Sequence, residues 1–216
     1  PAFWAMEAVA HGAEIVSFFR YRQVPRAQEQ MHAALRLPDG GPAPAWASVQ
    51  RFVEALSALE DAAPAQAPVG LLFDYAACWA SDIQPHAPAM GALGQAFHFY
   101  SAARSLGLDI DIVGPTADLG GYKLLLIPGT VHVSECFVAA VKGCGAHCLI
   151  GPRSGSRDQE MALPDTLAPG PLQELVPLRV TAVDSMRRGA ARDFQLHGKP
   201  EAITRWYEYV ETDLDP

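Results

Sequence analysis

The sequence predicts an α/β protein built on a doubly wound parallel sheet, preceded by a strand–helix unit that belongs to a larger structure. Short and almost wholly apolar runs, such as 69–73 and 123–129, are typical of strands buried on both faces of a parallel sheet. Amphipathic stretches such as 93–106 separate these runs, and this alternation favours helices on both faces of the sheet. One further apolar run lies in 13–22. Because one strand cannot form a sheet alone, we expect that N-terminal piece to come from a larger assembly of strands.

The first sixty residues predict two helices around that single strand. Apolar residues in 3–10 predict a helix that ends near Gly12, since glycine readily adopts the left-handed conformation that stops a helix. The run 15–19 predicts a buried strand. A breaker-rich loop is expected at 38–44. Apolar residues spaced three and four apart then predict an amphipathic helix over 48–60.

Residues 61–68 are rich in proline and alanine and carry few apolar anchors, so they predict a linker between two domains, 1–60 and 69–216. After the linker, the alternation of strands and helices predicts a flavodoxin-like, doubly wound domain. Its expected strands are 69–73, 108–113, 123–129, 147–150 and 179–183, its expected helices are 93–106, 134–141 and 172–178, and 203–210 fits either type.

Composition and charge exclude several classes of protein. Half of the 216 residues are hydrophobic, so the chain can bury a core, and the formal net charge is −8. A nucleic-acid binder needs a basic stripe, whereas the densest basic stretch here is three arginines in 187–192. Apolar runs fall well short of the roughly 18–20 residues that span a bilayer. We therefore expect neither a nucleic acid nor a membrane as partner.

The cysteines favour buried thiols over a metal site. They are Cys78, Cys136, Cys144 and Cys148, with His147 between the last two. A structural zinc site needs four ligands at characteristic spacing, and C-x-x-C pairs are absent, so no metal and no cofactor is expected. Free thiols and the absence of a signal peptide predict a cytoplasmic protein. The start at Pro1 instead of methionine suggests a piece of a longer chain.

The segment Gly151 to Ser156, which reads GPRSGS, leaves two interpretations open. It could cradle an anion at a helix start, but it lacks the lysine of a P-loop, so a plain loop is favoured. A catalytic cysteine would need to sit on a strained turn after a strand, and the turn after Ile150 contains no cysteine. We expect this domain to be catalytically silent, with a hydrolase or amidotransferase using Cys144 or Cys148 as an alternative.

Several motifs occur in a fixed order. The first block holds WAMEAVAHGAE at 4–14, FFRYRQ at 18–23 and EQMHAA at 29–34. Together they resemble the last strand–helix unit of the catalytic barrel in glycoside hydrolase family 42 β-galactosidases. Three later motifs resemble segments of the middle domain of the same family, and the resemblance covers residues 3–185. These later motifs are LFDY at 72–75, DLGGYKL at 118–124 and PGPLQEL at 169–175.

The resemblance implies a (β/α)₈ barrel followed by a glutamine-amidotransferase-like domain that makes trimer contacts, hence a homotrimer. The family hydrolyses terminal β-galactosyl residues with retention, using two glutamates after the fourth and seventh barrel strands. Both positions lie before Pro1, so we expect no catalytic residue in this chain and no activity from it alone. An isolated barrel strand exposes apolar surface, so residues 1–37 should be poorly packed or adventitiously covered. A non-catalytic interaction module is the alternative.

The resemblance also assigns galactose contacts to Phe19, Glu29 and His32. Barrel active sites lie at the C-terminal ends of the strands, where this loop follows. A carboxylate accepts hydroxyl hydrogen bonds, an imidazole adds a donor, and an aromatic ring covers an apolar sugar face. From the residues alone, an exposed helical pair and a core phenylalanine remain the alternatives. Tyr21 stands where the family usually has tryptophan, and Pro38 replaces a second histidine, so the loop should differ.

Overall fold

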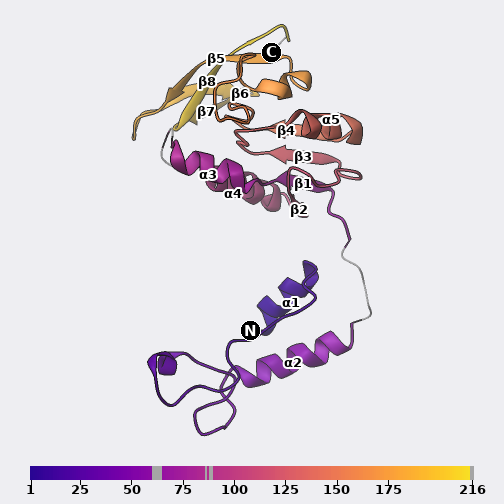
Figure 1. Ribbon diagram of the computed structural model, residues 1–216, viewed down its shortest axis with the longest axis vertical. Helices are drawn as coiled ribbons and strands as arrows, with labels where there is room; N and C mark the ends of the chain where they lie inside the picture. The colour runs from indigo at the N-terminus through magenta and orange to yellow at the C-terminus, as the bar shows by residue number, and fades with distance from the viewer. Residues whose placement is uncertain (60–64, 86, 88–89, 215–216) are drawn as a thin grey trace. The chain divides into compact units, whose positions relative to one another are not determined.

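The structure is a computed structural model that describes residues 1–59, 65–85, 87 and 90–214. The chain divides into two compact units, Pro1–Ala65 and Gln66–Pro216. Figure 1 shows the elements of each unit. The first half of the predicted linker at 61–68 lies outside the described residues, so its extent stays a prediction.

Two helices, α1 (Ala2–Ala10) and α2 (Trp46–Ser57), form the helical part of the first unit. Gly12 follows α1 at φ 90°, the left-handed stop expected there. On α2, the Phe52 ring is buried and packs edge-on against Phe18, with the ring centroids 6.1 Å apart. Both predicted helices are confirmed, with ends shifted by a few residues.

The predicted strand in 13–22 is wrong for this chain. The segment has no regular strand, and within the described residues its one bridge joins Arg22 to Arg36. Ile15 and Phe19 are 85% and 71% exposed. A strand satisfies its backbone by pairing with neighbours, and neighbouring strands are missing from the described part of this unit. The exposed apolar side chains confirm the expectation that these residues are poorly covered.

The second unit is built on a four-stranded parallel sheet. Its strands are β1 (Val69–Leu72), β2 (Ile110–Val113), β3 (Leu124–Ile127) and β4 (His147–Ile150). Their order across the sheet is β2-β1-β3-β4. Leu71 of the central strand aligns with Ile112 on one side and with Leu126 on the other. The four predicted strands and the doubly wound order are thereby confirmed.

Helices cover both faces of this sheet (Figure 1). Alternate side chains of a strand point to opposite faces, so neighbouring residues of β1 enter different cores. Leu71 packs in the cluster that α4 (Ala92–Ser105) covers, whereas Leu72 packs in the cluster under α5 (Glu135–Cys144). The helices predicted at 93–106 and 134–141 are therefore confirmed, and α5 begins after Ser134, whose Oγ accepts from Phe137 N at 3.1 Å.

One helix, α3 (Tyr75–Ile83), was not predicted from the sequence. Its N-terminus is capped by Asp74, whose Oδ1 accepts a hydrogen bond from Ala76 N at 2.9 Å. The helix buries Ala77 in a small cluster with Ala92 at the start of α4.

The predicted helix at 172–178 is also wrong. A short 3₁₀ helix, η2 (Gly170–Glu174), is followed by strand β5 (Leu178–Ser185). Pro177 explains the difference, since the residue before a proline is disfavoured in helical conformation. β5 contains the strand predicted at 179–183 and pairs antiparallel with β8 (Trp206–Thr212).

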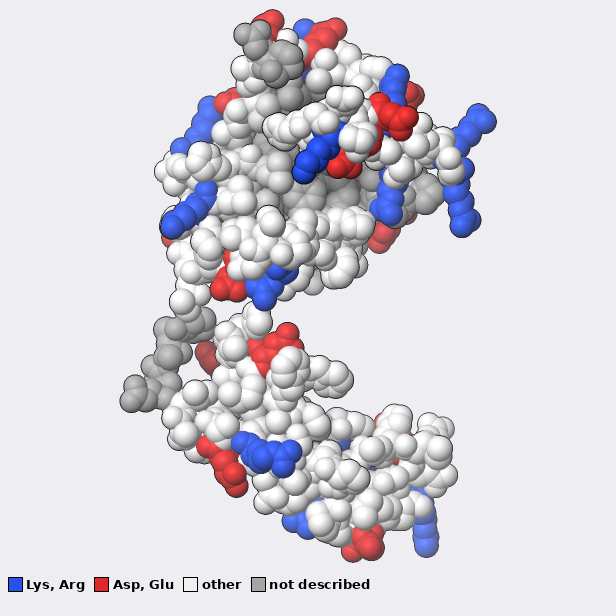
Figure 2. All heavy atoms as spheres, turned by 180° about the vertical axis from the view of Figure 1, so that it is seen from behind, with Lys and Arg blue, Asp and Glu red and all other residues white. Residues whose placement is uncertain are grey.

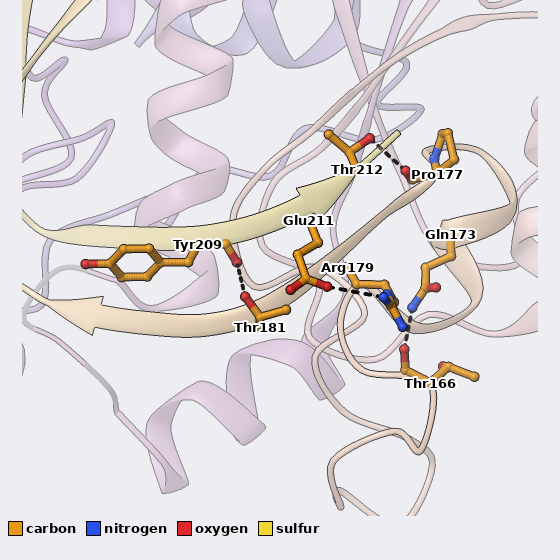
Figure 3. Close-up of polar contacts among 8 residues, drawn as sticks. All are labelled: Thr166, Gln173, Pro177, Arg179, Thr181, Tyr209, Glu211 and Thr212. Carbon is orange, nitrogen blue, oxygen red and sulfur yellow. Dashed lines mark hydrogen bonds and ion pairs between the residues drawn. The ribbon is translucent and has the colours of Figure 1, made fainter. Parts of the chain in front are cut away.

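The β5–β8 ribbon is held at several points along its length (Figure 3). Thr181 Oγ1 donates to Tyr209 O at 3.4 Å, and Thr212 Oγ1 donates to Pro177 O at 2.9 Å. A second hairpin, β6 (Arg192–Leu196) with β7 (Lys199–Ile203), was not predicted. The segment 203–210, for which the sequence allowed either a helix or a strand, contains the last residue of β7 and the first five residues of β8.

Acidic and basic side chains are interspersed over the face drawn in Figure 2. Of the helices in the described ranges, none combines the length and the apolar character needed to cross a bilayer.

Candidate functional site

The loop that carries the candidate residues is anchored to the extended segment before it. Leu35 N donates to Arg20 O at 3.0 Å, and Arg36 N donates to Tyr21 O at 2.8 Å. The Arg36 guanidinium carbon lies 4.4 Å from the ring centroid of Trp46 at the start of α2. These contacts fix where the loop returns, and so they position the residues between its two ends.

Phe19, Glu29 and His32 lie together around Arg20. Arg20 forms an ion pair with Glu29, and its guanidinium carbon lies 4.6 Å from the Phe19 ring centroid. The His32 ring meets the Phe19 ring edge-on, with centroids 6.4 Å apart. Glu29 sits in the short 3₁₀ helix η1 (Gln28–Met31), and its carbonyl accepts from His32 N at 3.0 Å. One helical turn therefore sets the spacing of the carboxylate and the imidazole.

Arg20 is the residue of this cluster that the sequence did not single out. Its side chain is 15% exposed, whereas that of Glu29 is 52% exposed. Its Nε is sealed from solvent without a hydrogen-bond partner in the described chain. A buried guanidinium therefore holds an accessible carboxylate by a charge-assisted contact, which restricts where that carboxylate can point. The signal in the sequence was an arginine directly after the aromatic pair at 18–19.

The cluster offers a ligand three kinds of contact. The exposed Glu29 carboxylate accepts hydrogen bonds, the exposed His32 imidazole donates or accepts them, and the exposed Phe19 ring presents an apolar face. The carboxylate is already partly neutralised by Arg20. This combination suits a polyhydroxylated ring, which has many hydroxyl groups and apolar C–H faces.

The carboxyl edge of the parallel sheet, where doubly wound proteins commonly bind ligands, is filled by α4. A Cβ added to Gly129, just after β3, would lie 2.4 Å from Gln95 Nε2. A Cβ added to Gly151, just after β4, would lie 2.9 Å from Phe99 Cζ. Side chains of α4 therefore fill the space beside Gly129 and Gly151 at the ends of β3 and β4.

The candidate thiols lack the environment of a nucleophile. Cys144 Sγ donates to Val141 O at 3.1 Å. Burial, together with the neighbouring Cys144, raises the pKa of Cys148. A reactive cysteine needs the opposite shift, because the thiolate is the nucleophile. In the part of the chain that the structure describes, groups of three or more His, Cys, Asp or Glu side chains placed to hold a metal ion are absent.

Comparison with known protein families identifies both units. Residues 2–59 match a family model described as β-galactosidase, and residues 67–214 match one described as β-galactosidase trimerisation domain. The second match alone covers more than half of the chain.

Individual relatives agree with the family models. A β-galactosidase of Thermus thermophilus is 44% identical over 213 residues, which cover 99% of this chain and 33% of the relative. β-Galactosidase Bga of Halorubrum lacusprofundi is 37% identical over 225 residues, covering 97% and 32%. The crystal structure of β-galactosidase from psychrophilic Marinomonas ef1 superposes with a TM-score of 0.89 at 36% identity, covering 99% of this chain and 34% of that one. The chain thus spans about a third of the length of these relatives.

Proposed function

Because this chain belongs to the glycoside hydrolase family 42 β-galactosidases, we propose that it is part of a retaining enzyme that hydrolyses terminal β-D-galactosyl residues. The first unit is then the end of the catalytic barrel, and the second is the trimerisation domain. All four cysteines are free thiols, as expected in a reducing compartment, and we propose a cytoplasmic location.

The observation that carries the role of the first unit is the cluster of Phe19, Glu29 and His32 around Arg20. Glu29 and His32 bind hydroxyl groups of the galactosyl unit, and Phe19 packs against its apolar face. Glu29 needs to point in one direction to do this, and the ion pair with the mostly buried Arg20 supports that role.

The two catalytic carboxyls come from the part of the protein outside these residues. A retaining glycosidase places an acid and a nucleophile about 5–5.5 Å apart. The cluster supplies a single carboxylate, Glu29, and that carboxylate is engaged with a guanidinium. The first unit is therefore a wall of the sugar pocket and has no catalytic pair, so the chain alone is inactive.

The second unit assembles the protein into a homotrimer. The match to a trimerisation-domain model supports this role. Sedimentation velocity of the whole protein should give three times the mass of one chain, and a strict monomer at all concentrations would contradict it. The alternative is an interaction module without a catalytic barrel, and turnover by the whole protein decides between the two.

The test of the sugar contacts uses the whole protein and an aryl β-galactoside. Glu29→Gln keeps the size of the side chain and removes its charge, which also breaks the pairing with Arg20. Loss of a charge-assisted hydrogen bond is worth about 1.5–3 kcal/mol, so kcat/KM should fall by about 10- to 150-fold. His32→Ala should also lower kcat/KM. Glu14→Gln, at an exposed position of the same unit, should leave kcat/KM unchanged, and equal losses in all three variants would contradict the assignment.

A further inference from the structure

A hollow of about 380 Å³ lies between the loop after β4 and the β5–β8 ribbon, within the second unit. Its polar wall comes from the segment GPRSGS and the residue that follows it, and its apolar wall comes from the ribbon and the loop before it. The residues that matter here are Arg153, Arg157, Leu167, Val183, Trp206 and Glu208. The hollow plays no part in the proposed galactoside site.

Arg153 is a buried arginine with one carboxylate, that of Glu208, in its neighbourhood. The residue is 6% exposed, yet in the described chain its guanidinium makes neither a hydrogen bond nor an ion pair. The guanidinium carbon lies 5.7 Å from the centroid of the Trp206 ring. Arg153 lines the hollow, and its guanidinium nitrogens are not among the sealed atoms that lack a partner in the described residues. Burying a cation in this way is costly unless an anion joins it.

The backbone holds Arg153 in place at some cost. Its φ is 66°, in the left-handed region that residues other than glycine rarely adopt. Arg153 N donates to Glu208 Oε1 at 2.8 Å, and Trp206 Nε1 donates to the same oxygen at 2.9 Å. Burial, followed by the neighbouring charge of Arg157, lowers the pKa of Arg153, and the Glu208 carboxylate opposes that shift only in part. The loop and the ribbon therefore keep a cation where an additional negative charge would be favourable.

The charges around the hollow indicate which anion fits. The charged residues that line the hollow are Arg153, Arg157 and Glu208, and Glu208 Oε1 already accepts hydrogen bonds from Arg153 N and Trp206 Nε1. A single guanidinium without a direct ion pair complements a monoanion better than a dianion such as phosphate at high pH. The remaining wall includes Leu167 and Val183 and the face of Trp206, which favour an apolar body.

We propose that this hollow binds a monocarboxylate with a short apolar body, its carboxylate against Arg153 and its body against Trp206. The planar guanidinium fork matches the geometry of a carboxylate. The carboxylate comes either from a free small molecule or from an aspartate or glutamate side chain outside the 216 residues. Both sources share the same recognition chemistry.

The test is a titration of the full 216-residue chain with sodium benzoate, followed by ¹⁵N NMR at the indole N–H of Trp206, assigned with Trp206→Phe. We expect saturable binding with a Kd on the order of 1 mM. Arg153→Gln should weaken binding by at least about tenfold, as should replacing benzoate with neutral benzamide. The matched control, Arg179→Gln, removes an exposed arginine of the same ribbon that pairs with Glu211 (Figure 3), and it should leave the Kd unchanged.

Two further measurements separate the remaining outcomes. Melting curves verify that each variant is folded, and Arg157→Gln, which should also weaken binding, replaces Arg153→Gln if the latter does not fold. Benzoate binding to both the chain and the whole protein indicates a free carboxylate, whereas binding to the chain alone indicates a carboxylate of the protein itself. Absence of binding to the chain, or equal binding of benzoate and benzamide, would overturn the proposal.

Discussion

The substitution Gly155→Ala is expected to be among the most destabilising single changes in the second unit. Gly155 has a φ of 62°, and its N–H donates to Thr130 O at 2.9 Å. A Cβ at this position would lie 1.8 Å from Pro169 O and 2.6 Å from Pro169 C. Both of these atoms belong to the backbone, so a side-chain rotation cannot relieve the overlap, and the two loops must separate.

The magnitude follows from two costs. Placing an L-residue in the left-handed region costs roughly 1–2 kcal/mol. Forcing extra atoms into a packed site costs typically about 1–3 kcal/mol. The free energy of unfolding should therefore fall by about 2–5 kcal/mol. Gly143→Ala is the matched control, because Gly143 lies in helix α5 and a Cβ there would meet nothing within 4 Å. Alanine is the better helix former, so this variant should be more stable by about 0.5–1 kcal/mol.

Urea unfolding followed by circular dichroism measures both changes. The dependence of the unfolding free energy on urea concentration (the m-value) should be the same in all variants, so that a shift in midpoint reports a change in stability. The reasoning would be refuted if Gly155→Ala lost less than about 0.5 kcal/mol, a size ordinary for a surface substitution, or if Gly143→Ala lost as much as Gly155→Ala.

Three other predictions concern the core and the titratable groups of the second unit. Ile127→Ala, at a fully buried position of β3, should lower the free energy of unfolding in urea by about 2–5 kcal/mol. Ile112→Ala, at a position of β2 that is 65% exposed, should lower it much less, and equal losses would contradict the core assignment. Iodoacetamide followed by peptide mass spectrometry should modify exposed Cys136 before Cys148, because burial raises the pKa of the Cys148 thiol, and the reverse order would contradict it. Burial and a hydrogen bond to a carboxylate raise the pKa of Tyr122 above its ordinary 10.0, so this residue's stability contribution is present below pH 10 and is lost as the pH rises through the raised pKa. Tyr122→Phe should flatten that alkaline loss of stability in thermal melts, and an unchanged slope would count against it.

The sheet of the second unit could be predicted because its strands are apolar on both faces and are complete within the chain. β1 and β4 lie where their apolar runs placed them. The run at 15–19 is equally apolar, yet it forms no strand, because pairing depends on neighbours that its own residues do not encode. Local pattern thus identified the type of segment, and only the presence of partners decided whether it became a strand.

The errors after residue 70 have local causes. Helix α3 (Tyr75–Ile83) begins almost directly after β1, with Asp74 as its cap, so few residues separate the two elements. The helix predicted at 172–178 ignored the restriction that Pro177 places on the preceding residue. The β6–β7 hairpin turns at His197 and Gly198, both at positive φ, but its residues are too exposed to give an alternating pattern.

The candidate site could be predicted only in part. Glu29 and His32 are three positions apart, so a helical turn brings them together by sequence spacing alone. Phe19 joined them through the resemblance to a known family. The sequence does not single out Arg20, and it places Arg153 only within the segment 151–156, for which a plain loop is favoured over an anion site. Burial makes a charged side chain informative, and burial is a tertiary property.

The most direct measurement of the central claim is hydrolysis of an aryl β-galactoside by the purified 216-residue chain beside the whole protein. The account predicts turnover by the whole protein and none above background by the chain, since the acid and the nucleophile lie elsewhere. Turnover by the chain itself would contradict it, provided that the turnover persists after a second purification that removes contaminating β-galactosidase.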